Sequence, residues 1–245
     1  MRSFEDPTFA PRPMWPELER LIGRCPVPVD QVPLDTQTAR HTLEHLQVST
    51  ETALGAFVAH SGGLWVDHGW LRIYGSPSRQ EPTRLPGLAT MNWFPRDAAE
   101  PSPVHGLVVG HDVLGGAYVL NGHQPEADGR PGQPGEMLYF APDALRWEEL
   151  GASYADWLAW VLDDGLRDFS AGLRWQGWES EVSDLTGDLG INLFPPLWSE
   201  EAHTDLGATT RTAVPLSELV DIARETAEQL NGGGVGSLGR FEGSP

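Results

Sequence analysis

Two adjacent pairs of Asp and His are the residues of this sequence best suited to chemistry. Asp67 precedes His68, His111 precedes Asp112, and each pair follows a short apolar run. A His oriented by a carboxylate can act as a general base, and both residue types bind metal ions. One hypothesis is therefore a small hydrolase or metal-dependent enzyme, which requires both pairs to converge in one pocket. The alternative is structural, because an Asp at a turn commonly accepts backbone amides beside an exposed His.

Two further motifs match patterns of known sites but lack the context of those sites. Residues 41–45, HTLEH, have two histidines one helical turn apart with a Glu between them, as in zinc peptidases, but no third ligand is identifiable. Gly234, Gly236 and Gly239 have the spacing of a dinucleotide-binding loop, which requires a preceding strand and a following helix. We therefore predict no catalytic residue, no metal site and no cofactor.

Composition excludes several classes of function. The 245 residues include 35 acidic residues, 16 arginines and no lysine, which gives a formal net charge of −19. Without lysine there is no Walker-type phosphate loop and no Schiff-base chemistry. The negative charge opposes binding to nucleic acid and would attract a basic protein partner.

The distribution of apolar residues and cysteine indicates the compartment. No apolar run approaches the roughly 18 to 20 residues that span a bilayer, and residues 1–15 lack the apolar core of a signal peptide. Cys25 is the single cysteine, so no intramolecular disulfide can form. We expect a cytoplasmic protein that does not bind membranes.

Tryptophan is abundant, with ten residues, and several lie beside acidic residues near the ends of predicted elements. Such residues could form a binding surface through aromatic anchoring and electrostatic steering. They could also line an aromatic pocket for a small molecule, or fill the junctions between a sheet and its helices. The candidate binding surface comprises Asp67, His68, Trp70, Arg72, His111, Asp112, Trp147, Glu148, Glu149, Trp175, Trp178, Glu179 and Glu181.

The apolar pattern predicts one α+β domain over residues 14–230, an irregular arm over residues 1–13 and a disordered Gly/Ser-rich tail over residues 231–245. The connections between strands are too short for helical crossovers, so we expect a mainly antiparallel central sheet flanked by helices. Helices are predicted after Pro16, after Asp35, after Ser153, over 178–185 and from Pro215. Strands are predicted at 54–60, 62–69, 70–75, 106–109, 117–121, 137–141, 145–149, 191–194 and 210–214, with a surface excursion over 76–103.

Four segments together resemble a bacterial family known as domain of unknown function family 2625. They are LGAFVAHSGGLWVDHGWLRIYGS, HDVLGGAYVLNG, MLYFAPDALRWEELGASYADWLAWVL and FSAGLRWQGWESEV. With the later LFPPLWS and AVPLSELV, the similarity covers roughly residues 14 to 230. This resemblance implies no activity.

The order of elements resembles, more distantly, the SUKH superfamily. The resemblance rests on the glycine-rich strands, the strand at 139–141 and the helix at 153–162. Many members of that superfamily are immunity proteins that neutralise toxins by direct binding, and it has no catalytic residue to carry over. The resemblance implies a SUKH-like fold, and together with the negative charge it favours a non-catalytic protein-binding domain of the immunity type that neutralises a basic toxin by direct binding.

Overall fold

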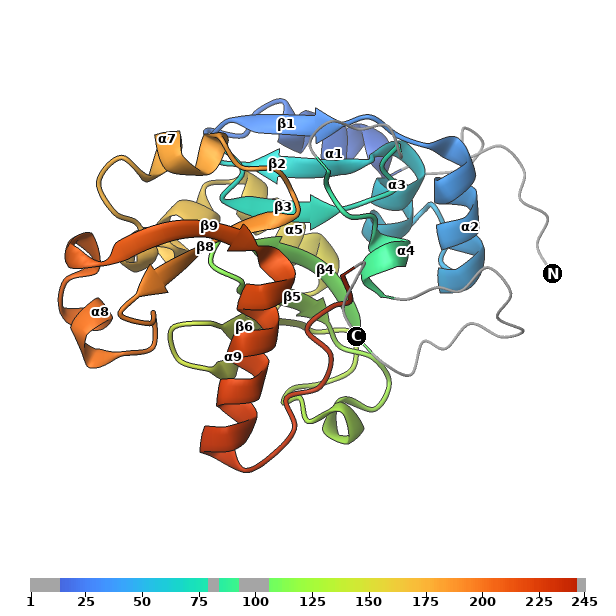
Figure 1. Cartoon of the computed structure of the whole chain (residues 1–245). Coiled ribbons are helices and arrows are strands. Elements are labelled where there is room, and N and C mark those ends of the chain that lie inside the picture. Colours follow the sequence, from blue (N-terminus) through green and yellow to red (C-terminus); the bar gives the residue numbers. More distant parts are fainter. Residues whose placement is uncertain (1–13, 79–83, 93–105, 242–245) are drawn as a thin grey trace.

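The computed structural model describes residues 14–78, 84–92 and 106–241. Its centre is a seven-stranded antiparallel sheet in which the strands follow one another in chain order (Figure 1). This confirms the predicted α+β class and the antiparallel sheet. The strands are β1 (Val29–Val32), β2 (Gly63–Val66), β3 (Leu71–Tyr74), β4 (Leu107–Asp112), β5 (Ala117–Leu120), β6 (Met137–Ala141) and β7 (Arg146–Glu149).

The turn between β2 and β3 carries the first Asp and His pair. Asp67, His68 and Gly69 all have positive φ angles, of 54°, 60° and 86°. Asp and His enter this left-handed region more readily than most side chains, and glycine does so without steric cost. A Cβ at Gly69 would also lie 2.4 Å from the ring of Trp65. The sequence DHG thus forms a tight hairpin turn, which brings β2 and β3 into register.

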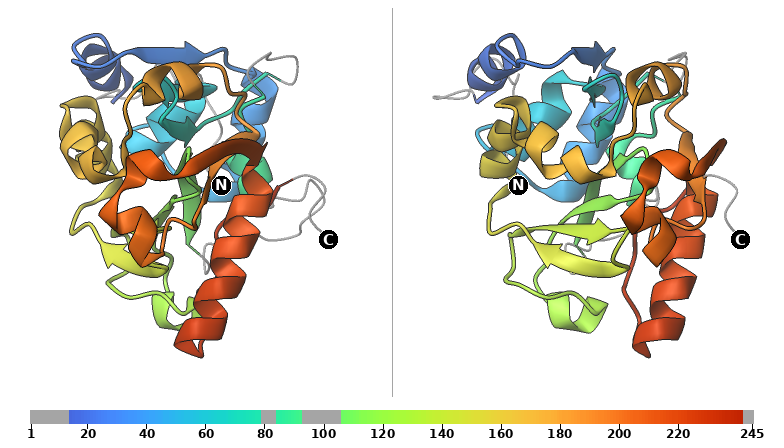
Figure 2. Two further views of the ribbon diagram at one scale, coloured as in Figure 1. Left: turned by 60° about the vertical axis from the view of Figure 1, so that its left-hand side comes forward. Right: turned by 90° about the vertical axis from the view of Figure 1, so that its left-hand side faces the viewer.

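Different layers cover the two faces of the sheet (Figure 2). Helices cover one face, where the ring of Tyr118 lies 5.4 Å from Trp157 and the ring of Tyr139 lies 5.1 Å from Phe169. The two-stranded sheet β8–β9, helix α9 and residues 232–241 cover the other face. The first layer contains α1 (Trp15–Ile22), α3 (Ala53–His60), α5 (Tyr154–Leu162) and α6 (Gly165–Phe169), and the second contains β8 (Leu189–Phe194), β9 (Thr210–Pro215) and α9 (Leu216–Asn231).

Shorter elements close the ends of these layers. Helix α2 contacts α3 and α4, and α7 lies beyond the turn between β2 and β3 (Figure 1). No helix in the described part of the chain is long and apolar enough to cross a membrane. These shorter elements are α2 (Thr36–Leu46), α4 (Leu88–Met91), α7 (Trp178–Ser183), α8 (Glu200–Thr204), and the 3-10 helices η2 (Pro125–Asp128), η3 (Ala171–Leu173) and η4 (Leu206–Ala208).

The strand predicted over residues 54–60 is wrong, because this segment is helix α3. Thr52 caps the helix by accepting the amide of Gly55, and every residue from Ala53 to Ala59 is buried. A helix that is buried all round carries no polar stripe, so its sequence resembles that of a buried strand. Strand β1 was missed for the opposite reason, since its short polar sequence lies among prolines and its central residues Asp30 and Gln31 are exposed.

Other elements also differ from expectation. Strands β8 and β9 do not extend the central sheet but pair with each other across its face. Within the predicted surface excursion, Leu85, Leu88 and Met91 are buried. Residues 232–241 pack against the domain instead of leaving it. The predicted arm over 1–13 and the last residues, 242–245, lie outside the described residues.

Candidate functional site

Asp67 forms a buried ion pair at the end of the sheet where β2 turns into β3. Its Oδ2 lies 2.7 Å from Nη2 of Arg174, and both side chains are at most one tenth exposed. The guanidinium group of Arg174 also lies 5.0 Å from the ring of Trp70 and 4.3 Å from that of Trp178. A desolvated cation gains from aromatic faces and from a carboxylate partner. Asp67 is therefore held as the counterion of Arg174 and not as a free base.

His68 is the exposed member of this pair. Its ring meets Trp178 edge-on at 6.0 Å, and its Nδ1 lies 3.5 Å from Oγ of Ser183. Neither contact orients the ring with a carboxylate, which a His general base would need. Asp67 and His68 thus fit the structural alternative stated for these pairs, an Asp held at a turn beside an exposed His.

Asp112 is buried at the end of β4 and belongs to the turn that follows. Its Oδ1 accepts the amides of Leu114 and Gly116 at 2.8 and 2.9 Å, and its Oδ2 accepts the hydroxyl of Tyr139 at 2.7 Å. Desolvation raises the pKa of this carboxyl to about 6, although the hydrogen bonds act in the opposite direction. Asp112 thus organises the connection between β4 and β5.

His111 points to the other face of the sheet, since successive residues of a strand alternate. Its Nε2 lies 2.8 Å from the carbonyl oxygen of Leu238, and its Nδ1 lies 2.8 Å from the hydroxyl of Tyr74. A carbonyl only accepts, so Nε2 carries the proton and Nδ1 accepts from Tyr74. Burial lowers the pKa of His111 to about 4. The ring is therefore neutral at pH 7 and enclosed.

Arg72 lies opposite His111 in β3 and is fully buried. It donates from Nη1 to the carbonyl oxygen of Leu189 in β8, and its guanidinium group lies 5.1 Å from the ring of Trp65. Its Nε and Nη2 have no hydrogen-bond partner among the described residues. Burial lowers the pKa of Arg72 to about 10, which still leaves it charged at pH 7.

The two Asp and His pairs do not form one catalytic group. His111 and Asp112 project to opposite faces of β4, and Asp67 is engaged by Arg174. Among the described residues, no group of three or more His, Cys, Asp and Glu side chains is placed to hold a metal ion. In the HTLEH segment the two rings pack against each other at 4.4 Å. The convergence required by the enzyme hypothesis is therefore absent from the described part of the chain.

The candidate binding surface divides into a buried part and two separate exposed parts. Trp70, Trp175 and Trp178 are buried in the core, so they fill the interior of the domain and do not form an exposed binding surface. Glu179 and Glu181 are exposed on α7, where Glu181 pairs with Arg211 of β9 at 3.2 Å. The half-buried Trp147 and its neighbours Glu148 and Glu149 lie in β7, at the sheet edge opposite β1.

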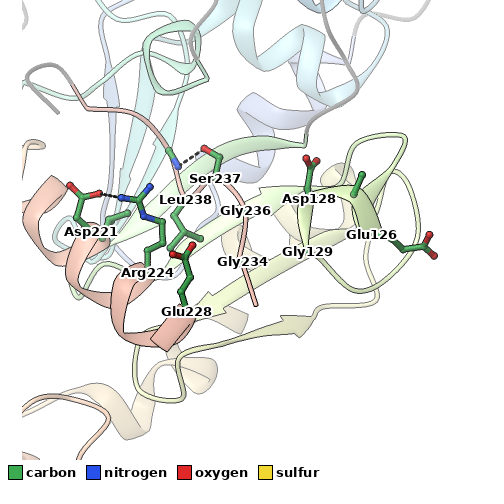
Figure 3. A pocket seen from close by; sticks show the side chains of 13 residues that line it. Glu126, Asp128, Gly129, Asp221, Arg224, Glu228, Gly234, Gly236, Ser237 and Leu238 are labelled. Atoms are coloured by element: carbon green, nitrogen blue, oxygen red, sulfur yellow. Dashed lines mark hydrogen bonds and ion pairs between the residues drawn. The ribbon is translucent and has the colours of Figure 1, made fainter. Parts of the chain in front are cut away.

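An open hollow of about 690 Å³ lies between α9, η2 and residues 234–239 (Figure 3). Its charged lining is mostly acidic, and only Arg224, which pairs with Asp221 at 2.9 Å, is basic. Glu126 and Glu228 are exposed on its rim. No sequence pattern predicts this hollow, because residues 125–130 and 234–239 are Gly- and Pro-rich segments more than a hundred residues apart. The charged lining residues are Glu126, Asp128, Asp221, Arg224 and Glu228.

The fold and these sites define an α+β protein in which three of the four Asp and His candidates for chemistry, Asp67, His111 and Asp112, are buried and bound to structural partners. The chain belongs to the family described as Protein of unknown function DUF2625, whose model matches residues 7–219. The family resemblance found in the sequence is thereby confirmed. The more distant resemblance to the SUKH superfamily stays a prediction.

Two bacterial relatives match the chain over most of its length. The uncharacterised protein YbfG of Escherichia coli is 34% identical over 216 residues, which are 87% of this chain and 92% of that protein. An uncharacterised protein of Haemophilus influenzae is 28% identical over 232 residues, 94% of each chain. No solved structure gives a significant match.

Proposed function

We propose that this chain is a non-catalytic binding domain that recognises a basic protein partner, as an immunity-type protein does when it neutralises a toxin. The observation that carries the proposal is the concentration of acidic residues in residues 163–205. This segment, the acidic segment below, holds ten of the 35 acidic residues and two of the 16 arginines. A surface of one sign accelerates association with partners of the opposite sign.

The two arginines of the acidic segment offset little of its charge at the surface. Arg174 is enclosed by Asp67 and two tryptophan rings, and Arg167 of α6 pairs with Asp164, the residue before this helix, at 3.1 Å. Most of the other acidic side chains are exposed, including Glu179 and Glu181 on α7. The excess of negative charge therefore faces solvent.

The acidic segment also offers an apolar contact. Phe194 ends β8 with 69% of its surface exposed, and the exposed Glu200 and Glu201 of α8 follow it six and seven residues later in the chain. Large exposed aromatic side chains are frequent anchors of protein interfaces, and surrounding charges supply steering. Strands β8 and β9 with α7 and α8 lie on one side of the molecule, which faces the viewer in the right panel of Figure 2.

The experiment compares two variants of equal net charge. Both are used, with the wild type, as tagged baits in a lysate of the host at low ionic strength, and a retained protein is then purified and titrated by calorimetry. The test variant carries Glu179→Gln, Glu181→Gln, Glu200→Gln and Glu201→Gln. The control variant carries Asp30→Asn, Glu19→Gln, Glu44→Gln and Glu51→Gln, at exposed positions outside the acidic segment.

We expect the wild type and the control variant to retain a basic protein in a stoichiometric complex that weakens as ionic strength rises. The test variant should lose it, and Phe194→Ser should weaken binding without changing the salt dependence. Equal weakening in the test and control variants would show that overall charge, and not this surface, acts. A wild-type bait that retains no basic protein would refute the proposal.

A further inference from the structure

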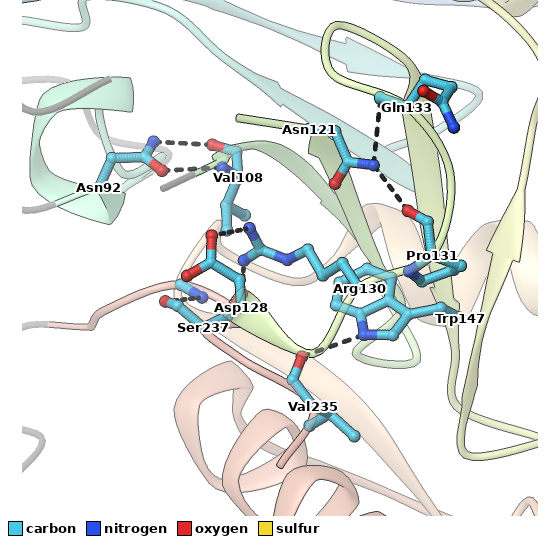
Figure 4. Close-up of polar contacts among 11 residues, drawn as sticks. Asn92, Val108, Asn121, Asp128, Arg130, Pro131, Gln133, Trp147, Val235 and Ser237 are labelled. Atoms are coloured by element: carbon cyan, nitrogen blue, oxygen red, sulfur yellow. Dashed lines mark hydrogen bonds and ion pairs between the residues drawn. The ribbon is translucent and has the colours of Figure 1, made fainter. Parts of the chain in front are cut away.

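Residues 232–241, which we call the strap, lie along the face of the central sheet after α9 ends (Figure 4). Three side chains of the domain bind the strap through its backbone carbonyl oxygens. Nε1 of Trp147 donates to Val235 at 3.0 Å, Nη2 of Arg130 donates to Ser237 at 2.6 Å, and Nε2 of His111 donates to Leu238. The main chain adds one bond, from the amide of Arg240 to the carbonyl oxygen of Met91 at 2.9 Å.

These contacts are of the kind by which proteins bind extended peptides. Hydrogen bonds to the main chain supply affinity that is independent of side chains, and pockets for a few side chains supply specificity. Two strap side chains, Val235 and Leu238, are buried, with 6% and 2% of their surface exposed. The strap is thus bound as an extended segment with two apolar anchors three residues apart.

Glycine is needed where the strap passes η2. Gly236 has a φ of 73°, and a Cβ there would lie 2.2 Å from the carbonyl oxygen of Asp128. A Cβ at Gly129 would lie 2.2 Å from the carbonyl oxygen of Gly234. The two main chains therefore approach too closely for side chains at these positions. Of the pattern Gly234, Gly236 and Gly239, it is Gly236 that this contact requires, and no helix follows the pattern within the described residues.

The groove under the strap is built within the range matched by the family model, and the strap is not. His111, Arg130 and Trp147 lie inside residues 7–219, whereas the strap begins thirteen residues later, at 232. The strap also forms one wall of the hollow with the acidic rim (Figure 3). Within the described chain, Glu126 and Glu228 on this rim form no ion pair, so they are available to an incoming basic side chain.

From this geometry we propose that the groove is a peptide-binding site, and that the strap is its internal occupant in the free chain. The partner is an extended segment with two apolar residues three apart among glycines or other small residues, flanked by arginine or lysine. It displaces the strap, takes over the bonds from His111, Arg130 and Trp147, and places its basic residues on the acidic rim. This site is separate from the acidic segment, so either proposal can fail alone.

The test uses the full-length chain with the strap released by Val235→Asp and Leu238→Asp, which place charges in the two apolar pockets. A fluorescein-labelled peptide of residues 232–241 is the probe, and anisotropy is the readout. We expect one peptide to bind each released chain, and the same peptide with both Asp substitutions not to bind. The wild type should bind the probe at least about tenfold more weakly, because its own strap competes.

The chemistry of the partner is tested with a second peptide that has two added lysines at its N-terminus. It should bind the released chain more tightly than the first at low salt, and Glu126→Gln with Glu228→Gln should remove that gain. A released chain that keeps its circular dichroism and cooperative unfolding but binds neither peptide would overturn the proposal.

Hydrogen exchange of the wild-type chain provides a test that does not depend on the variant. The amide of Arg240 should exchange at least about a hundredfold faster than that of Asp112, through opening of the strap alone. If both amides exchange only through global unfolding, the strap is a fixed part of the core and the proposal is wrong.

Discussion

Acidification should act on β4 through two adjacent buried residues that respond in opposite directions. The pKa of His111 is lowered from 6.5 to about 4, and the pKa of Asp112 is raised from 3.8 to about 6, in both cases chiefly by desolvation. Each shift favours the neutral side chain. Each therefore makes the free energy of unfolding depend on pH, because the native and unfolded states bind different numbers of protons.

The direction of each effect depends on which state holds the extra proton. Between pH 6.5 and about 4 the unfolded state binds a proton at His111 that the native state lacks, so stability falls as pH decreases. Between about pH 6 and 3.8 the native state binds the extra proton at Asp112, so stability rises as pH decreases. From pH 7 to pH 5, His111 costs about 2 kcal/mol and Asp112 contributes about 1 kcal/mol. The two effects therefore offset each other in part in the wild type.

Asp112→Asn removes one side of this balance. The amide oxygen still accepts from Leu114 and Gly116, and the new NH2 group can donate to the hydroxyl of Tyr139. Between pH 7 and 5 the variant should lose about 1 kcal/mol more of its free energy of unfolding than the wild type does. Urea unfolding followed by tryptophan fluorescence at pH 7, 6 and 5 measures this difference.

Two comparisons decide the outcome. The free energy of unfolding of the Glu149→Gln variant, changed at an exposed position, should depend on pH as that of the wild type does. That of the His111→Gln variant should increase as pH decreases from 7 to 5, because only the effect of Asp112 is left of the pair. If the Asp112→Asn profile is parallel to that of the wild type, or falls less steeply, Asp112 is not neutralised by burial and the reasoning is refuted.

Three further substitutions test the packing by urea unfolding at pH 7. Arg174→Met leaves Asp67 as an uncompensated buried charge and should lower the free energy of unfolding by about 3 to 5 kcal/mol. Adding Asp67→Asn should recover part of this loss. If the losses of the two single variants simply add in the double variant, the pairing is contradicted. Phe57→Ala removes a fully buried ring from α3 and should also cost about 3 to 5 kcal/mol, so a loss under about 1 kcal/mol would contradict its burial. Gly116→Ala places a Cβ 2.2 Å from Oδ2 of Asp112 and should cost about 1 to 3 kcal/mol, whereas an unchanged unfolding midpoint would exclude this contact.

The hairpins of the central sheet could be predicted from sequence because their signals are local. Short apolar runs separated by turn residues specify β2 to β7, and the DHG turn between the first two is an example. Helix α3 could not be recognised, since its type is decided by burial on all sides, which depends on α1, α2 and α5. Local sequence patterns therefore fail to predict secondary structure where the tertiary environment determines it.

The strap shows the same limit at the candidate site. Its glycines and single apolar residues have the composition of a disordered tail. What holds it is a set of donors that lie 88 to 127 residues earlier in the chain, in β4, after η2 and in β7. No period or motif within residues 232–241 encodes those partners. The same holds for Arg174, whose pairing with Asp67 joins two loops far apart in sequence.

Two buried residues of the candidate binding surface, Arg72 and His111, determine where the second layer docks on the sheet. Arg72 donates to Leu189 of β8, and His111 donates to Leu238 of the strap, so each anchors one covering segment by its main chain. A buried donor that loses its acceptor costs about 1 to 3 kcal/mol. A shift of either segment by one residue would leave such a donor unsatisfied, whereas apolar contacts alone would tolerate it. The unfavourable burial of Arg72 and His111 is thus explained by their role in fixing the register of β8 and the strap on the sheet.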